Sequence, residues 1–212
     1  MLRGSLFRSM GLCMALLTGC STMPASAGTE AAPPLEEGQA EAIFAGGCFW
    51  CMEKPFDGLD GVISTTSGYT GGKEEHPTYQ DVGYHRTSHY EALRVVYDPS
   101  KVSYDRLLEV FWHNVDPTQA DGQFCDKGDQ YRTGIFTSDA SEKKRAETSR
   151  KAVSEVLGQT VVTEILPKQV FWVAEAYHQD FYLKNPGHYS RYRKGCGRDA
   201  RLSQLWGDKA GH

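Results

Sequence analysis

The chain has 212 residues, of which 40% are apolar and 24% are charged, values typical of one globular domain with a sizeable core. Lys and Arg total 23 against 27 Asp and Glu, and this net charge of −4 gives no basic surplus for binding nucleic acid. Six cysteines are too few for a disulfide scaffold but too many to ignore. Their positions therefore decide which chemistry is available.

Residues 1–19 have the pattern of a secretory signal. Arg3 and Arg8 make its start positive, and the apolar run over residues 11–17 is too short to span a bilayer. We therefore expect these residues to be removed from the mature chain.

The segment that follows resembles a bacterial lipobox, Leu17-Thr18-Gly19-Cys20. In that pattern Cys20 carries a lipid, whereas cleavage after Ala27 would instead give a soluble secreted form. Small and polar residues dominate residues 20–40 and predict a flexible tether. We expect a periplasmic protein of the bacterial cell envelope that a lipid anchors to the membrane.

Strands and helices alternate along the domain that we expect over residues 41–207. Apolar and β-branched patterns predict strands over residues 41–47, 62–69, 90–97, 131–137 and 161–165. Helical spacing of apolar residues predicts helices over residues 48–56, 103–114, 139–157 and 171–183. We expect long loops over residues 71–84 and 116–130, an irregular tail after Pro186 and a disordered end over 208–212. The predicted class is α+β, a two-layer α/β sandwich of the ferredoxin-like plait type.

The first chemical feature is the thiol of Cys48, which follows Gly46 and Gly47 where a strand ends and a helix begins. The glycines permit a tight turn and a close approach of other groups. A helix N-terminus favours a thiolate over a thiol, so this position predicts a nucleophile with a lowered pKa. A buried structural cysteine is the alternative.

Cys48 and Cys51 also form a C-x-x-C pair, which leaves two other interpretations open. A thioredoxin-like dithiol is one, although no βαβ pattern frames the pair. A zinc site is the other, although Cys125 and Cys196 do not form a second closely spaced pair. We expect no metal.

Glu91 is the second chemical feature, because strand alternation places it on an apolar face of the strand over 90–97. A carboxyl in apolar surroundings has a raised pKa and can act as a general acid. An ion pair with Arg94 or His89 at an exposed strand end is the alternative.

An ordered series of motifs resembles the class A peptide methionine sulfoxide reductases over residues 41–207. The main matching motifs are Gly47-Cys48-Phe49-Trp50, Gly68-Tyr69-Thr70-Gly71-Gly72, Pro77-Thr78-Tyr79, His89-Tyr90-Glu91-Ala92, Asp116-Pro117-Thr118-Gln119, Gln130-Tyr131-Arg132 and Tyr177-His178-Gln179-Asp180. The resemblance implies reduction of methionine-S-sulfoxide, free or in oxidised proteins, with Cys48 as nucleophile and Glu91 as acid. It further implies that Phe49 and Trp50 hold the methyl group, and that Tyr79, Asp126 and Tyr131 position the sulfoxide oxygen.

The same resemblance implies a sulfenic acid on Cys48 that a second thiol converts to a disulfide. Flanking glycines favour Cys196 as this resolving cysteine, with Cys51 second and Cys125 third. A thioredoxin-fold dithiol protein would then supply the electrons to a monomeric enzyme without metal or flavin. The rival interpretation is a non-catalytic lipoprotein, a binding module whose cysteines form structural disulfides.

Overall fold

A computed structural model describes Met1 and residues 29–211. The expected signal, the lipid-bearing Cys20 and the alternative cleavage at Ala27 lie outside these described residues. Within the described part of the chain, no helix combines the length and hydropathy needed to cross a membrane.

A six-stranded sheet forms the centre of the domain, in the order β7-β6-β1-β3-β2-β8. Its strands are β1 (Ala40–Gly46), β2 (Val62–Thr70), β3 (Tyr90–Tyr97), β6 (Thr133–Thr137), β7 (Glu164–Pro167) and β8 (Trp172–Val173). Neighbouring strands are antiparallel except β6 and β7, which are parallel. The inner order β6-β1-β3-β2 is compatible with the expected ferredoxin-like plait.

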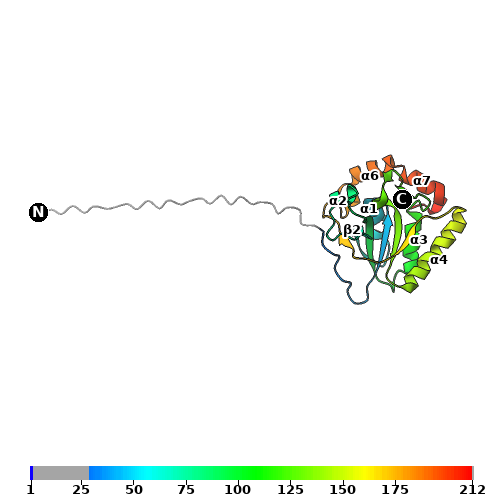
Figure 1. The fold of residues 1–212 in the computed structure, drawn as a ribbon, viewed down its shortest axis with the longest axis horizontal. Helices are drawn as coiled ribbons and strands as arrows, with labels where there is room; N and C mark the ends of the chain where they lie inside the picture. Colours follow the sequence, from blue (N-terminus) through cyan, green and yellow to red (C-terminus); the bar gives the residue numbers. More distant parts are fainter. Residues whose placement is uncertain (2–28, 212) are drawn as a thin grey trace.

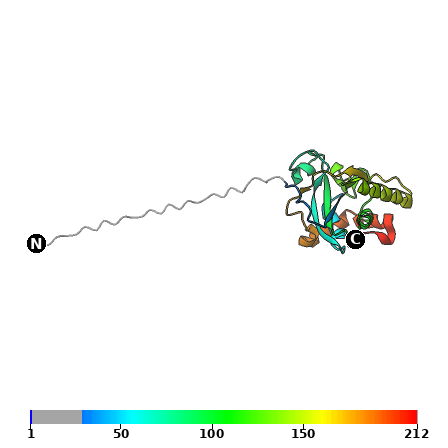
Figure 2. The same cartoon turned by 90° about the horizontal axis from the view of Figure 1, so that it is seen from below.

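Helices cover one face of the sheet, as Figures 1 and 2 show for α3 and α4. The helices are α1 (Phe49–Asp57), α2 (Tyr79–Gly83), α3 (Tyr104–His113), α4 (Ala140–Leu157), α5 (Phe181–Lys184), α6 (Pro186–Gly195) and α7 (Arg198–Trp206). Phe44 of β1 anchors this layer, since its ring stacks on Phe56 of α1 and on Phe111 of α3. The predicted two-layer α+β class is confirmed.

Residues 29–33 are bonded to the sheet and to the loops beside it, so the expected flexible tether over 20–40 is wrong for this part. Ala31 forms a bridge with Trp172, and the N–H of Ala32 donates to the Phe171 carbonyl at 2.8 Å. Thr29 is buried and donates to the Pro77 carbonyl. Composition suggested a tether because so few of these residues are apolar, but backbone hydrogen bonds to the sheet edge hold the segment.

Three further expectations fail after residue 170. The expected helix over 171–183 contains strand β8 and a turn, because Trp172 pairs with Tyr69 at the edge of β2. The expected irregular tail forms the helices α6 and α7, whose buried side chains include arginines that look like surface residues in the sequence. The end expected to be disordered contains a 3-10 turn over Gly207–Lys209, and Gly211 donates to the His113 carbonyl.

The two expected long loops also contain short elements. Residues 71–84 include α2, which begins at a capping box between Thr78 and Asp81. Residues 116–130 include a small hairpin of β4 (Gly122–Gln123) and β5 (Asp126–Lys127). Both elements carry residues of the site described next.

Candidate active site

Cys48 occupies the N-cap of α1, immediately after the turn that ends β1. Gly47 has a φ of 78°, and a Cβ built there would lie 2.5 Å from Cβ of Gln123. The turn therefore requires glycine for its backbone conformation and for the close approach of Gln123. This confirms the structural role predicted for the glycines.

The ionisation of the two free thiols differs from the prediction. Burial raises the pKa of Cys48, and its S–H donates to the sulfur of Cys51, which raises that pKa further. The hydrogen bond with Cys48, together with the positive charges of Arg198 and Arg193, lowers the pKa of Cys51 to about 6. The expected lowered pKa of Cys48 is therefore wrong in this dithiol state, because burial and the hydrogen bond to Cys51 favour the thiol form of Cys48 and the lower pKa belongs to Cys51.

The N-terminus of α1 supports a carboxyl group instead of the thiol. The N–H of Phe49 donates to Oε2 of Glu91 at 3.3 Å, and Glu91 is only 2% exposed. Burial raises the pKa of Glu91 to about 8, as the strand pattern predicts. Arg94 pairs with Glu41, and His89 lies 3.5 Å from a loop glutamate, so neither forms the alternative ion pair.

Aromatic rings surround the start of α1. Phe49 is buried, and the half-buried Trp50 stacks on Phe181 with ring centroids 3.7 Å apart. His178 fixes this arrangement, because its Nδ1 accepts a hydrogen bond from Nε1 of Trp50 at 3.0 Å and its ring lies 4.4 Å from that of Tyr79. These rings form an apolar surface beside Cys48.

Hydroxyl and carboxyl groups complete the site. Burial and then the Glu91 carboxyl raise the pKa of Tyr79 to about 12, and the same two causes raise the pKa of Tyr131. The hydroxyl of Tyr192 donates to Asp126 Oδ2 at 2.5 Å and also lies within hydrogen-bonding reach of Cys48. The expected oxygen-binding residues therefore gather near the thiol.

Tyr192 was missed in the sequence. It lies on α6, in the segment expected to be irregular, and this helix packs Tyr189 against Cys51. The three-residue spacing of Tyr189 and Tyr192, which puts both on one helix face, is the signal that could have indicated its role.

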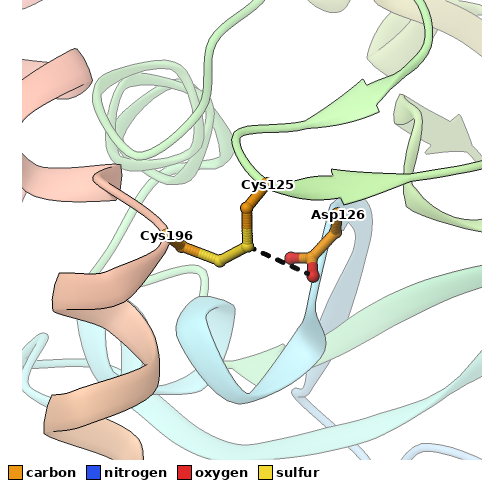
Figure 3. A group of neighbouring side chains, drawn as sticks. All are labelled: Cys125, Asp126 and Cys196. Carbon is orange, nitrogen blue, oxygen red and sulfur yellow. Dashed lines mark hydrogen bonds between the residues drawn. A yellow bond between two sulfur atoms is a disulfide. The ribbon is translucent and has the colours of Figure 1, made fainter.

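Cys125 and Cys196 are joined by a disulfide across 71 residues of sequence, with Cα atoms 4.9 Å apart (Figure 3). Cys196 has no thiol to offer in this state, in contrast to the expectation that it is free to reach Cys48. The sulfurs of this pair and an Asp126 oxygen lie within 4.8 Å of one another, but both sulfurs are already bonded, so the four-cysteine zinc interpretation does not apply to this state. Cys48 and Cys51 remain free, which a purely structural set of cysteines does not explain.

A free vicinal thiol pair, a protonated carboxyl and an apolar slot define a thiol-dependent reductase site. A family model described as peptide methionine sulfoxide reductase matches residues 40–210. The Bacillus subtilis peptide methionine sulfoxide reductase MsrA is 47% identical over 177 residues, which cover 82% of this chain and all of that protein. MsrA 2 of Caulobacter vibrioides is 46% identical over 187 residues, covering 88% of this chain and 93% of that protein.

Solved structures agree with these relatives. Mxr1 from Saccharomyces cerevisiae in its reduced form has a TM-score of 0.68 and 30% identity, over 75% of this chain and 91% of that one. Methionine sulfoxide reductase A of Corynebacterium diphtheriae has a TM-score of 0.64 and 32% identity, over 71% of this chain and 77% of that one. The chain belongs to the peptide methionine sulfoxide reductase family, and it is a thiol-dependent reductase of methionine sulfoxide.

Proposed function

We propose that Cys48, Cys51 and Glu91 carry out methionine-S-sulfoxide reduction, for the repair of oxidised proteins. The observation that carries this assignment is the arrangement of three groups in one buried site. Cys48, whose pKa burial raises, is paired with Cys51, whose pKa is lowered, and Glu91, whose pKa burial raises, accepts a hydrogen bond from Phe49 at the start of the same helix.

In the first step, the sulfur of Cys48 attacks the sulfoxide sulfur. Its proton passes to the Cys51 thiolate, to which it is already hydrogen-bonded. Glu91 gives its own proton to the sulfoxide oxygen, which gains negative charge as the bond forms. Methionine leaves with its electron pair, the oxygen stays on Cys48 as a sulfenic acid, and Glu91 becomes a carboxylate.

The surrounding residues orient the substrate for this attack. Phe49 and Trp50 provide the apolar surface for the methyl group, and Tyr79 and Tyr131 donate hydrogen bonds to the oxygen. Both tyrosines have raised pKa values, so they stay protonated as donors at neutral pH. Asp126 acts through the hydroxyl of Tyr192, which it holds beside the reacting thiol.

In the second step, Cys51 attacks the sulfur of Cys48, and the oxygen leaves as water with the Cys51 proton. The product is a Cys48–Cys51 disulfide. We favour Cys51 over the expected Cys196 because Cys51 contacts Cys48 directly, whereas Cys196 is bonded to Cys125. An external dithiol must then reduce the new disulfide.

We infer that a thioredoxin-type protein supplies these electrons. One structure of yeast Mxr1 shows that protein in complex with Trx2. We further propose that the protein lies in the bacterial periplasm, anchored by a lipid on Cys20, because the lipobox-like sequence ends at that cysteine. We propose that it acts as a monomer.

A single-turnover experiment tests this proposal. The full-length protein, with its Cys125–Cys196 bond intact, is mixed with methionine S-sulfoxide and no reductant. We expect about one equivalent of methionine and a new disulfide that peptide mapping assigns to Cys48 and Cys51. Absence of methionine would overturn the proposed activity, and a Cys48–Cys196 bond would overturn the assignment of Cys51.

A further inference from the structure

Arg198 is a buried arginine without a carboxylate partner. It is the first residue of α7 and is only 1% exposed. Its Nη2 donates to the carbonyls of Gly46 at 3.1 Å and Asn114 at 2.8 Å, whereas its buried Nε has no acceptor. Within residues 29–211 it takes part in no ion pair.

A buried cation is costly unless a negative charge or a full set of hydrogen bonds compensates for it. The buried Arg193 follows this rule, and the half-exposed Arg201 is paired in the same way. Arg193 lies 2.6 Å from Asp199, and Arg201 lies 2.6 Å from Asp116. Arg198 alone of these three has no carboxylate at ion-pair distance, and the Phe124 ring lies 4.4 Å from its guanidinium carbon. The Asp126 carboxyl acts on it without contact, so a further anion close to Arg198 would be stabilised.

The guanidinium of Arg198 lies directly against the turn that carries both active-site thiols. Gly46, whose carbonyl it binds, lies two residues before Cys48. The sulfur of Met52, which follows Cys51, lies 3.3 Å from the same Nη2 atom. The cation therefore contacts this turn on both sides of the C-x-x-C sequence.

We propose that the Cys51 thiolate is the counter-charge of Arg198, and that Arg198 is a positioning residue that keeps Cys51 ionised between turnovers. The inference rests on the proposed function, in which Cys51 accepts the Cys48 proton and then resolves the sulfenic acid. It explains both why a cation is buried without a carboxylate and why Cys51 holds the thiolate of the pair.

Charged and titratable groups from several elements face Cys51. They are Cys48 at the start of its own helix, Arg198 on α7, Arg193, Tyr189 and Tyr192 on α6, Asp126 on β5 and Glu91 on β3. The hydrogen bond from Cys48 lowers the pKa of Cys51 most, followed by the charge of Arg198 and then that of Arg193. Asp126 opposes this effect, and Arg193 is already paired with Asp199. Among the described residues, Arg198 is thus the cation facing Cys51 that has no carboxylate at ion-pair distance, although its charge also acts on Asp126.

A thiolate titration of the full-length protein tests this assignment. Thiolate absorbance in the ultraviolet is followed against pH in Cys48→Ser and in Cys48→Ser/Cys51→Ser, and the difference reports Cys51 alone. The serine that replaces Cys48 retains a hydroxyl donor toward Cys51. The pKa of Cys51 in the wild type is about 6, and we expect a midpoint near the same value in this background. Adding Arg198→Gln should raise the midpoint by at least one unit, which lowers the thiolate fraction at pH 6 severalfold.

Two variants separate charge from structure. Arg198→Lys retains the cation and should keep the midpoint within about half a unit of the parent. Arg201→Gln removes a charge from the same helix, but one that Asp116 already compensates, and should leave the midpoint unchanged. Circular dichroism checks that each variant is folded.

The inference is overturned if Arg198→Gln is folded and titrates like its parent. If Arg198→Gln does not fold, the Cys48→Ser parent and its Arg198→Lys variant decide. A midpoint of the parent at the ordinary thiol value of about 8.5 excludes a counter-charge role for Cys51. The titration uses no substrate. Its failure is therefore distinguishable from failure of the proposed function, which the methionine assay decides.

Discussion

Substitution of Glu91 by Gln should make the protein more stable and far less active. Gln has nearly the shape of a protonated Glu, and its oxygen can accept the hydrogen bond that Phe49 donates. It cannot give a proton to a sulfoxide oxygen. The substitution therefore removes the proposed acid while keeping the packing of the site.

The stability gain follows from the raised pKa of Glu91. Burial moves this pKa from 4.5 to about 8, so between these two values the folded protein binds a proton that the unfolded chain has released. Stability is therefore lost as pH rises through this window. From pH 4.5 to pH 7 this window covers about 2.5 pH units, which corresponds to a loss of about 3 kcal/mol in the free energy of unfolding. Glu91→Gln avoids this cost, so its advantage should be about 3 kcal/mol at pH 7 and vanish below pH 4.

Urea denaturation at pH 4, 7 and 8.5 measures this difference, and single-turnover methionine release measures the chemistry. Loss of a general acid costs on the order of 10²- to 10⁴-fold in rate. For the wild type, the rate contribution of protonated Glu91 should decline above pH 8. If the stability advantage of Glu91→Gln over the wild type is no larger at pH 8.5 than at pH 4, the buried protonated carboxyl is refuted. A variant that retains most of its rate would refute the acid role.

Other substitutions give separate checks. Cys48→Ser should release no methionine. Cys51→Ser should release less methionine than the wild type over the same time and accumulate a sulfenic acid on Cys48, which dimedone traps. Rapid turnover of Cys51→Ser without a trapped adduct would contradict the two roles of Cys51. Gly47→Ala should lower the free energy of unfolding by at least about 1 kcal/mol, because its φ is 78° and the added Cβ would lie 2.5 Å from Gln123. Gly58→Ala is the matched control, since the φ of Gly58 is negative and no atom lies within 4 Å of a Cβ built there. Equal melting temperatures of the two variants would contradict the reasoning.

Local patterns predicted the site where the chemistry depends on neighbours in sequence. The turn at Gly46 and Gly47 and the burial of Glu91 follow from strand alternation and glycine geometry, and the structure confirms both. The pKa of Cys48 did not follow in this way. A helix N-terminus favours thiolate in isolation, but here the Phe49 N–H binds Glu91, and Cys51 shares the proton of Cys48.

The C-terminal segment shows the same limit on a larger scale. Its Arg, Tyr and Gly residues resemble an exposed tail, because their burial depends on contacts with the distant turn before α1. Tyr192 comes near Cys48, and Arg198 contacts the residues on either side of the two thiols, only after α6 and α7 pack at the end of the sheet where α1 begins (Figure 1).

The sequence by itself determined the family, the nucleophile position and the buried acid, because motifs and strand periodicity are local properties of the chain. Only the tertiary structure decided which cysteines pair and which thiol is ionised. Disulfide pairing requires Cα atoms within a few ångströms of one another, and Cys125 meets Cys196 across 71 residues. Ionisation depends on burial and on charges from α6 and α7, which no spacing within Cys48–Cys51 reveals.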